Sequence, residues 1–361
     1  MICGMAMKVC LFLVMLIFAA PAAANPANDT ASSVAAKTVR FVVLGDMPYS
    51  DAEYALLEQP NGAIAKAIHA LNPSVLIHLG DFKRGRLACN DDLFQDHYRQ
   101  IAYLNPHKTV YTPGDNDWTD CDRFNTSTRY DELERLGYLR QLFFQQDRQQ
   151  LTRDIPGLTR QEGFIENAQW NIGPVAFATL HIPGTNNGRR EILRSNIDDA
   201  LNEADRRDRM NAEWLQRRFA TAESAQAVVI AFQADMFDFD YEKPACSASN
   251  RTDCDGFRLL RDLIKDKAGQ FKKPVLVIHG DTAAYCLHQP YPNIPNLWRL
   301  NAPGDYKYID ASQIVFDAEN KDMPFTVTGL LDRKPAPAVC DDNLLSLSRY
   351  FPFHSLKIQT S

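Results

Sequence analysis

The sequence predicts an α/β protein with mixed, largely parallel sheets. Two features of the chain support this prediction. Short apolar runs rich in β-branched residues, each stopped by a glycine or a polar residue, indicate buried strands. Between them lie longer stretches with apolar residues at helical spacing, and the alternation of strand and helix is typical of parallel βαβ units. The 361 residues, 45% apolar and 23% charged, suffice for a soluble globular protein with a substantial core.

The first third of the chain carries three predicted strands and two helical stretches. The strands cover residues 40–45, 74–80 and 108–114. Apolar spacing predicts helices at 52–71 and 92–104. The break at Pro60-Asn61-Gly62 is expected to divide the first helical stretch into two.

The rest of the chain continues the pattern and then changes it. Predicted helices cover residues 130–150 and 196–222, and predicted strands cover 173–182, 225–233, 274–279, 306–316 and 323–330. Alternating apolar and polar residues in the last two strands indicate antiparallel pairing. Because no internal repeat is present, we expect one domain over residues 38–361, with an inserted loop near 235–256.

The N-terminus has the features of a secretory signal peptide over residues 1–24. Lys8 precedes an apolar run at 9–20, and small residues follow up to the predicted cleavage site after Ala24. A membrane anchor is the alternative, but the run is shorter than the ~20 residues that a spanning helix needs. We therefore expect a periplasmic or secreted protein with a flexible lead-in at 25–37 and no membrane span after signal removal.

Eight cysteines occur, and the six outside the predicted signal are an even number, which favours disulfides in an oxidising compartment. Cys246 and Cys254 lie in one polar loop and could close it. Cys89 and Cys121 each follow a candidate site loop and could join the two. Zinc binding is the competing interpretation, but no Cys-x-x-Cys pair supports it.

The charge of the chain argues against a polyanionic partner. The formal net charge is −6, and no block of like charge stands out. A mildly acidic chain lacks the basic patch that binds nucleic acid or anionic lipid, so we expect no nucleic-acid footprint.

Polar residues follow five predicted strands at the point where each strand ends. They are Gly45-Asp46, Gly80-Asp81, residues 114–117, residues 233–235 and residues 279–281. In parallel α/β sheets such ends meet at one edge, so these groups should converge. A single Asp after a strand is more often a turn or helix cap. Several converging carboxylates instead repel one another unless a cation lies between them, and their oxygens suit Mg²⁺, Mn²⁺ or Ca²⁺.

The order of these motifs resembles that of the calcineurin-like metallophosphoesterase family. The family outline is Asp-x-His, Gly-Asp, Gly-Asn-His-Glu/Asp, an isolated His and Gly-His-x-His, each at a strand end. The corresponding segments here are Asp46-Met47-Pro48, Gly80-Asp81, Gly114-Asp115-Asn116-Asp117, Gln233 and Gly280-Asp281-Thr282-Ala283. The resemblance covers about residues 39–283 and the closing strands, and it implies an α/β/β/α sandwich.

The resemblance also implies a metal centre rebuilt with oxygen ligands. In the family two metals share one bridging Asp, which corresponds to Asp81. The first metal site retains Asp46, whereas Pro48 and Ala283 replace its histidines. The second site retains oxygen donors throughout, at Asp81, Asp115, Gln233 and Asp281. We expect one firmly bound divalent cation there, Mg, Mn or Ca rather than Zn or Fe, with Asp46 reaching it directly or through water.

The catalytic candidates implied by the resemblance lie beside this site. Asn116 stands where the family has a His that aids the leaving group or the transition state, and it can still hydrogen-bond a phosphoryl oxygen. Asp117 would orient it. Lys83 is either a point charge for a phosphate oxygen or a solvated surface lysine, and Arg84 is the next candidate.

Other polar residues are candidates for the pocket wall. They are Tyr49, His181, Asn186 and Asn187 as substrate-binding residues, and His279 as a replacement for a lost imidazole. For Tyr49, a place in the core or at the rim is favoured. For both histidines, a hydrogen-bonded place in the core is the favoured alternative.

Together these features predict an exported metal-dependent phosphoesterase that hydrolyses a small phosphomonoester or phosphodiester through a metal-activated water. The alternative is a catalytically weak or inactive protein of the same fold that serves as a metal-binding or ligand-binding module. The missing histidines at positions 48, 116 and 283 favour this alternative. A serine or cysteine hydrolase is poorly supported, since no Gly-x-Ser-x-Gly motif occurs.

Overall fold

Strand β1 (Thr38–Leu44) is the central strand of a five-stranded sheet, in the order β12-β11-β1-β2-β3. The computed structural model describes residues 37–145, 150–237 and 243–340. The other strands of this sheet are β2 (Leu76–His78), β3 (Thr109–Tyr111), β11 (Ser312–Asp317) and β12 (Phe325–Gly329). The apolar runs that predicted strands near residues 40, 76 and 110 therefore do form one sheet.

A second sheet has seven strands in the order β4-β5-β6-β7-β8-β10-β9. Its strands are β4 (Thr159–Gln161), β5 (Phe164–Ile172), β6 (Val175–Thr179), β7 (Ala227–Ala231), β8 (Val275–His279), β9 (Cys286–His288) and β10 (Leu297–Asn301). The predicted strands at 173–182, 225–233 and 274–279 are its three middle strands.

Both sheets are mixed, but they are less parallel than the sequence predicts. In the described chain five strand pairs are parallel, namely β1–β2, β2–β3, β6–β7, β7–β8 and β8–β10. Five others are antiparallel, namely β1–β11, β11–β12, β4–β5, β5–β6 and β9–β10. The reason is partly local, because only residues 173–174 separate β5 from β6, and so short a connection joins antiparallel strands.

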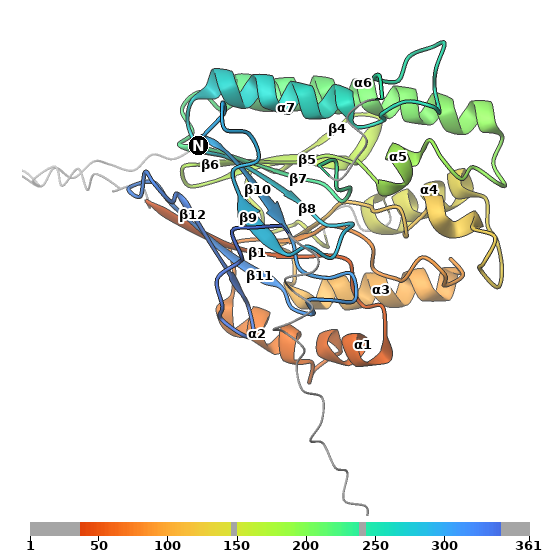
Figure 1. The fold of residues 1–361 in the computed structure, drawn as a ribbon. Helices are drawn as coiled ribbons and strands as arrows, with labels where there is room; N and C mark the ends of the chain where they lie inside the picture. The colour runs from red at the N-terminus through yellow and green to blue at the C-terminus, as the bar shows by residue number, and fades with distance from the viewer. Residues whose placement is uncertain (1–36, 146–149, 238–242, 341–361) are drawn as a thin grey trace, which may run out of the picture. The chain divides into compact units, whose positions relative to one another are not determined.

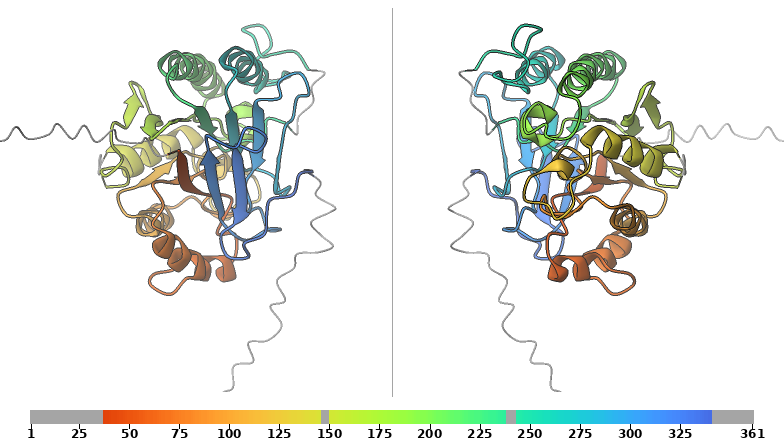
Figure 2. Two further views of the ribbon diagram at one scale, coloured as in Figure 1. Left: turned by 90° about the vertical axis from the view of Figure 1, so that its left-hand side faces the viewer. Right: turned by 90° about the vertical axis from the view of Figure 1, so that its right-hand side faces the viewer.

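The two sheets pack face to face and carry helices on their outer faces (Figure 1). Phe41 of β1 contacts Phe177 of β6 edge to face, with ring centroids 5.2 Å apart, inside a core cluster shared by both sheets. Burial of such apolar surface is the main force that holds the layers together. Views from both sides show the same succession of helix, sheet, sheet and helix (Figure 2).

The helices divide between the two outer faces. Those against the five-stranded sheet are α1 (Asp51–Leu57), α2 (Ala63–Leu71) and α3 (Asp91–Leu104). Those against the seven-stranded sheet are α6 (Ile197–Thr221) and α7 (Arg258–Phe271). The predicted break at residues 60–62 separates α1 from α2. Helix α6 buries Trp214, Leu215 and Phe219 against its sheet.

Four short elements complete the described chain. α4 (Glu132–Arg140) ends ten residues before the predicted helix end, and a π turn (Gln141–Gln145) follows it. A 3₁₀ turn, η1, covers Thr119–Asp122. The segment labelled α5 (Gly184–Gly188) is not a right-handed helix, because its three inner residues have positive φ.

Some elements were not predicted. Helix α7 shows Leu260, Ile264 and Ala268 buried at intervals of four residues, a pattern that the sequence does contain. Strands β4, β5, β9 and β10 were also missed. β10 matters most for the site, because the chain that follows it returns to the edge where the polar residues gather.

The six cysteines form three disulfides. Cys89–Cys121 and Cys246–Cys254 are the two pairs that their places in the sequence suggested, with Cα atoms 5.5 and 4.9 Å apart. The third pair is Cys286–Cys340. Disulfides of this kind are characteristic of oxidising compartments.

The ends of the chain leave two predictions untested. The predicted signal at 1–24 and, apart from Lys37, the lead-in at 25–37 lie outside the described residues. All residues that the structure describes fall in one compact unit, residues 35–361. In that part of the chain, no helix combines the length and the apolar character that crossing a membrane requires.

Candidate metal centre

Carboxylates from both sheets meet beyond the carboxyl ends of the parallel strands. Asp81 follows β2, Asp115 follows β3 and Asp281 follows β8. One carboxylate oxygen from each lies within 4.8 Å of the other two, and we call these three residues the acidic cluster. The predicted convergence is thus present, although the residues are up to 200 positions apart in the sequence (281 − 81 = 200).

The acidic cluster opens into a cavity of about 310 Å³. Its walls come from the loops that follow the strands and from the chain after β10. The lining residues are Tyr49, Asp81, Gly85, Arg86, Asp115, Asn116, Asp120, Arg123, Asn125, Asp281, Asp305 and Tyr306. A ligand that enters this cavity therefore meets acidic oxygens on one side and arginine side chains on another.

The backbone turns sharply at three of the acidic residues. Asp46, Asp81 and Asp281 have φ values of 52°, 54° and 71°. The left-handed region costs about 1 kcal/mol or more for residues other than glycine, although Asp tolerates it better than most. Such strain persists where the surrounding structure holds it, and it concentrates at functional sites.

Glycines beside the carboxylates are required by space. A Cβ at Gly114 would lie 2.0 Å from Asp81 Oδ1, and one at Gly280 would lie 1.8 Å from Asp46 Oδ2. The neighbouring carboxylates occupy the room that these glycines leave.

We expect Gly114→Ala to lower the free energy of unfolding by about 1–3 kcal/mol, because Asp81 is hydrogen-bonded in place and cannot retreat freely. The matched control is Gly269→Ala in α7, where an added Cβ meets nothing within 4 Å. That control should gain up to about 1 kcal/mol, since alanine is the better helix residue. Urea unfolding measures both, and equal effects would contradict this account.

Gln233 binds the acidic cluster through its nitrogen, whereas the sequence suggested an oxygen ligand. The backbone N–H of Gly184 donates to Gln233 Oε1 at 2.7 Å. The Nε2 group consequently faces the cluster, at 2.9 Å from Asp81 Oδ2, 3.3 Å from Asp115 Oδ1 and 3.1 Å from Asp281 Oδ1. The buried Gly184 N–H needs an acceptor, so the Gln233 amide is oriented with its oxygen toward Gly184 and its nitrogen toward the acidic cluster.

Asp46 lies directly behind the acidic cluster. Its Oδ1 accepts the backbone N–H of Asp281 at 2.9 Å. Its Oδ2 is buried, with no hydrogen-bond partner among the described residues. An unpaired buried carboxylate oxygen is unfavourable unless a proton or a cation compensates it.

Burial and mutual repulsion make this site strongly electronegative. The pKa values of Asp46, Asp81 and Asp281 are all raised well above their usual range. Burial is the first cause in each case, and the next is a neighbouring carboxylate, Asp281 for Asp46 and Asp115 for the other two. Without a compensating positive charge, the site holds protons that it would release on binding a cation.

Asp117 holds two strand-end loops together. Its carboxylate accepts the backbone N–H groups of Asp81, Phe82 and Gly114 at 2.9–3.0 Å, and the Tyr111 hydroxyl at 2.8 Å. The resemblance suggested that Asp117 orients Asn116, but in the described chain its carboxylate accepts from these four donors instead. Burial raises its pKa to about 6.

Asn116 and Tyr49 line the cavity beside Asp81. The Asn116 side-chain amide donates to the Tyr49 hydroxyl at 2.9 Å and to Asp81 Oδ2 at 3.1 Å. The Tyr49 hydroxyl in turn donates to Asp81 Oδ2 at 3.2 Å. Asn116 therefore lies next to the carboxylates, as the resemblance suggested. Tyr49 is buried, as the favoured core interpretation has it, and it also lines the cavity.

Lys83 fits neither of its two expected roles. Its side chain is fully buried, does not line the cavity, and its Nζ has no hydrogen-bond partner in the part of the chain that the structure describes. Burial lowers the pKa of Lys83, and the largest effect in the opposite direction comes from the negative charge of Asp120. Lys83 is thus a buried counter-charge behind the site and not a ligand for phosphate.

The positive charges at the cavity come from other residues. Arg86 and Arg123 line it, and Arg123 Nη1 lies 2.6 Å from Asp120 Oδ2. Arg84 lines a neighbouring cavity of about 380 Å³ that shares only Tyr49 with the first. The spacing of these arginines contains no signal that separates them from surface residues.

Neither the family models nor the curated proteins that were searched match this sequence. The geometry of the site must therefore carry the functional argument.

The two histidines singled out in the sequence lie in the core. His181 donates from Nδ1 to Glu166 at 2.9 Å and accepts the Trp118 indole N–H at Nε2. His279 pairs with Gly280 O and with Arg299. Both imidazoles are fully buried, and burial lowers each pKa to about 4. The structure thus agrees with the core interpretation for both.

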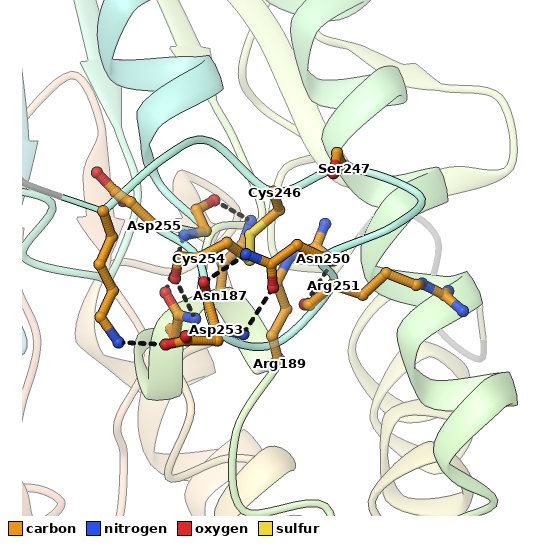
Figure 3. Close-up of a disulfide and its surroundings, with 12 residues drawn as sticks. Asn187, Arg189, Cys246, Ser247, Asn250, Arg251, Asp253, Cys254 and Asp255 are labelled. Atoms are coloured by element: carbon orange, nitrogen blue, oxygen red, sulfur yellow. Dashed lines mark hydrogen bonds and ion pairs between the residues drawn. A yellow bond between two sulfur atoms is a disulfide. The ribbon is translucent and has the colours of Figure 1, made fainter.

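Asn186 and Asn187 bind the protein itself. Asn186 Nδ2 donates to Cys254 O at 3.1 Å, and Asn187 Nδ2 donates to Asp208 Oδ1 at 2.6 Å. Figure 3 shows Asn187 lying against the loop that the Cys246–Cys254 disulfide closes. Both side chains are buried, so we no longer count them among substrate-binding residues.

A second buried acid pair lies behind η1. Glu132 lies near the Asp122 carboxyl, whose Oδ2 accepts the backbone N–H groups of Leu193 and Arg194. Burial, and then Asp122, raises the pKa of Glu132 from 4.5 to about 8. Glu132 is therefore protonated in the folded protein over a pH range in which it is ionised in the unfolded chain.

We expect this pair to make stability fall as pH rises. Between about pH 4.5 and 8 the folded state keeps a proton on Glu132 that the unfolded chain has lost. The contribution of this proton to the free energy of unfolding is complete below pH 4.5 and is lost as the pH rises past 8. Glu132→Gln should remove that dependence and gain up to about 4 kcal/mol over the wild type at pH 8. The measurement is urea unfolding at several pH values, with the exposed Glu134→Gln as control. Parallel profiles for wild type and Glu132→Gln would refute the shared proton.

Proposed function

We propose that this protein is a metal-dependent phosphoesterase of the metallophosphoesterase type, acting on a small phosphomonoester or phosphodiester. One observation carries the proposal. Three carboxylates, two of them buried and that of Asp281 half-buried, come from strand ends in two different sheets and converge to within 4.8 Å in the lining of a cavity. If the three Asp residues only capped turns or helices, each would find its partner within its own loop, and the carboxylates would not need to lie together.

The residues fit a hard divalent cation. Three oxygens no more than 4.8 Å apart can share a centre within about 2.8 Å of each, close to the 2.3–2.6 Å of calcium–oxygen bonds. A smaller ion such as Mg²⁺, at about 2.1 Å, would need a modest closing of the cluster. Asp46, which accepts the Asp281 N–H, adds a further acidic oxygen, its Oδ2, that is buried and has no hydrogen-bond partner among the described residues. Carboxylates favour Mg, Mn or Ca over Zn or Fe.

The chain's own groups can bind a phosphoryl group above the carboxylates. Arg86 and Arg123 line the cavity and supply positive charge, and the Asn116 amide can donate to a phosphoryl oxygen. Tyr306 packs against Tyr49, with ring centroids 4.8 Å apart, and forms an aromatic wall for the rest of the ester. A bound cation would supply Lewis-acid polarisation and a more acidic water.

A second candidate function is cation or ligand binding without turnover. No histidine is among the cavity-lining residues that the structure describes. Asn116 cannot deliver a proton to a leaving group as an imidazolium can. On this alternative, the cation would hold the strand-end loops together and the cavity would capture a ligand.

The proposed place of action is outside the cytoplasm. The three disulfides support an oxidising compartment, the periplasm or the exterior. The predicted signal peptide points the same way.

One experiment separates the two functions. Residues 25–361 are stripped with a chelator and given Mg²⁺, Mn²⁺, Ca²⁺ or Zn²⁺ singly, and hydrolysis of generic phosphomonoesters and diesters is measured beside thermal stability. Turnover that needs a cation and disappears in Asp81→Asn supports the phosphoesterase. Cation-dependent stabilisation without turnover supports the binding protein.

The matched control is Asp266→Asn, an acidic residue on α7 whose side chain is 57% exposed. It should behave as the wild type in both assays. A chain that neither hydrolyses nor gains stability with any cation would remove both proposals.

A further inference from the structure

Thr185, Asn186 and Asn187 form a rare backbone arrangement beside the acidic cluster. Their φ values are 53°, 55° and 59°, and their ψ values are 43°, 46° and 43°. Three consecutive residues other than glycine in the left-handed region are costly, because each Cβ crowds the following carbonyl. We call these three residues the left-handed turn. Something outside it must hold it in place.

The left-handed turn is directly connected to the acidic cluster. The Thr185 hydroxyl lies 2.8 Å from Asp115 Oδ2 and 3.2 Å from Asp120 Oδ1. Gly184, immediately before the turn, donates its N–H to Gln233. A Cβ at Gly184 would lie 2.4 Å from Asp115 Oδ2. The position of this turn therefore determines where one oxygen of Asp115 points.

The loop closed by the Cys246–Cys254 disulfide holds the other side of the turn. Asn186 bonds this segment twice, donating to Cys254 O and accepting the Gly256 N–H at 2.9 Å. Asn187 Nδ2 lies 3.2 Å from Gly256 O. A Cβ at Gly256 would lie 2.5 Å from Asn186 O, so the two backbones touch.

Charged residues anchor the same loop to helix α6. Arg251 pairs with Asp205 at 2.9 Å, and Arg189, which follows the turn, pairs with the same carboxylate at 2.7 Å. Arg207, fully buried, donates to Asn187 O at 2.8 Å. The loop, the turn and α6 thus form one connected support behind Asp115.

We propose that Thr185 is a positioning residue of the metal centre and that the Cys246–Cys254 disulfide, acting through Asn186 and the left-handed turn, sets the affinity of that centre for its cation. The inference rests on the proposed cation site. Reduction by a dithiol breaks the sulfur–sulfur bond and gives two thiols, while the dithiol becomes a disulfide. Once the loop is released, the turn is free to relax, Thr185 leaves Asp115, and cation binding weakens.

Two substitutions test the role of Thr185. Thr185→Val removes the hydroxyl at nearly constant volume and should weaken Mg²⁺, Mn²⁺ or Ca²⁺ binding about tenfold, since a hydrogen bond to a charged group is lost. Thr185→Ser keeps the hydroxyl and should restore near wild-type affinity. Calorimetric titration measures the affinity, and unfolding without cation shows whether each variant is folded. If Thr185 had only a structural role, the variants would differ in stability, and Thr185→Val would not bind the cation more weakly than Thr185→Ser.

The disulfide is tested by Cys246→Ser/Cys254→Ser, with Cys286→Ser/Cys340→Ser as matched control. The first double variant should lose cation affinity several-fold and the control should not. Combining the first with Thr185→Val should add little, because both act through the same turn.

The outcomes distinguish this inference from the function on which it rests. A wild type that binds no cation overturns both. A wild type that binds a cation, with Thr185→Val and Cys246→Ser/Cys254→Ser binding it equally well, overturns only the positioning role of Thr185 and the disulfide.

Discussion

Replacing Asp117 by alanine should lower the free energy of unfolding by about 3–5 kcal/mol and abolish cation binding. The carboxylate accepts three backbone N–H groups and one hydroxyl, all buried. Alanine leaves the N–H groups of Asp81, Phe82 and Gly114 without their acceptor. Those groups belong to the loops that carry two residues of the acidic cluster, so the site should come apart as stability falls.

The measurement is urea unfolding without cation, followed by calorimetric titration. Asp117→Asn keeps the shape but offers one acceptor oxygen in place of two, so an intermediate loss is expected. The control is Asp92→Ala, an exposed residue at the start of α3 that should cost well under 1 kcal/mol. A loss of less than about 1 kcal/mol in Asp117→Ala would show that the two loops are held by other contacts.

The strand ends were predictable because each is marked locally. An apolar run followed by Gly-Asp identifies Asp46, Asp81, Asp115 and Asp281. Parallel pairing of β2 and β3 brings Asp81 and Asp115 together, and the packing of the second sheet adds Asp281. The order of the motifs then predicted the sandwich of two sheets. These features depend on short stretches of sequence and on one general rule about parallel strands.

The remaining features of the site depend on contacts between distant parts of the chain. The orientation of the Gln233 amide is decided by the Gly184 N–H, 49 residues away. The burial of Lys83 is decided by packing against several elements, and a lysine two residues after a strand-end Asp does not reveal it. Asp305 and Tyr306 reach the cavity only because β10, a strand without a clear sequence signal, returns the chain there.

Backbone strain is the feature least accessible to sequence reasoning. Asn186 and Asn187 tolerate the left-handed region better than most residues, so a turn was a reasonable expectation. Nothing in the local sequence shows that Thr185 also adopts the left-handed conformation. Nor does it show that the segment next to a disulfide loop, Gly256, holds Asn186 from 70 residues away.

Asp115→Asn should have opposite effects on the two properties of the site. Burial is the largest cause of the raised pKa values of Asp81, Asp120 and Asp281, and the charge of Asp115 is the next. Asp115 also raises the pKa of Asp46, after burial, Asp281 and Asp305, so its charge repels at least four carboxyl groups. Removing that charge should raise the free energy of unfolding without cation by about 1 kcal/mol at pH 8. The same change removes a ligand, and cation affinity should fall about 100-fold or more.

The substitution is well suited to the site because asparagine can satisfy the neighbours of Asp115. Its oxygen can accept the Asn116 N–H, and its amide can donate to the Thr185 hydroxyl, which rotates to accept. Asp81→Asn lacks this advantage, since Asp81 Oδ2 faces donors from Tyr49, Asn116 and Gln233. Urea unfolding with and without cation measures both effects, with Asp266→Asn as control. An Asp115→Asn variant that is less stable than the wild type without cation, yet binds the cation equally well, would mean that these carboxylates serve the backbone and not an ion.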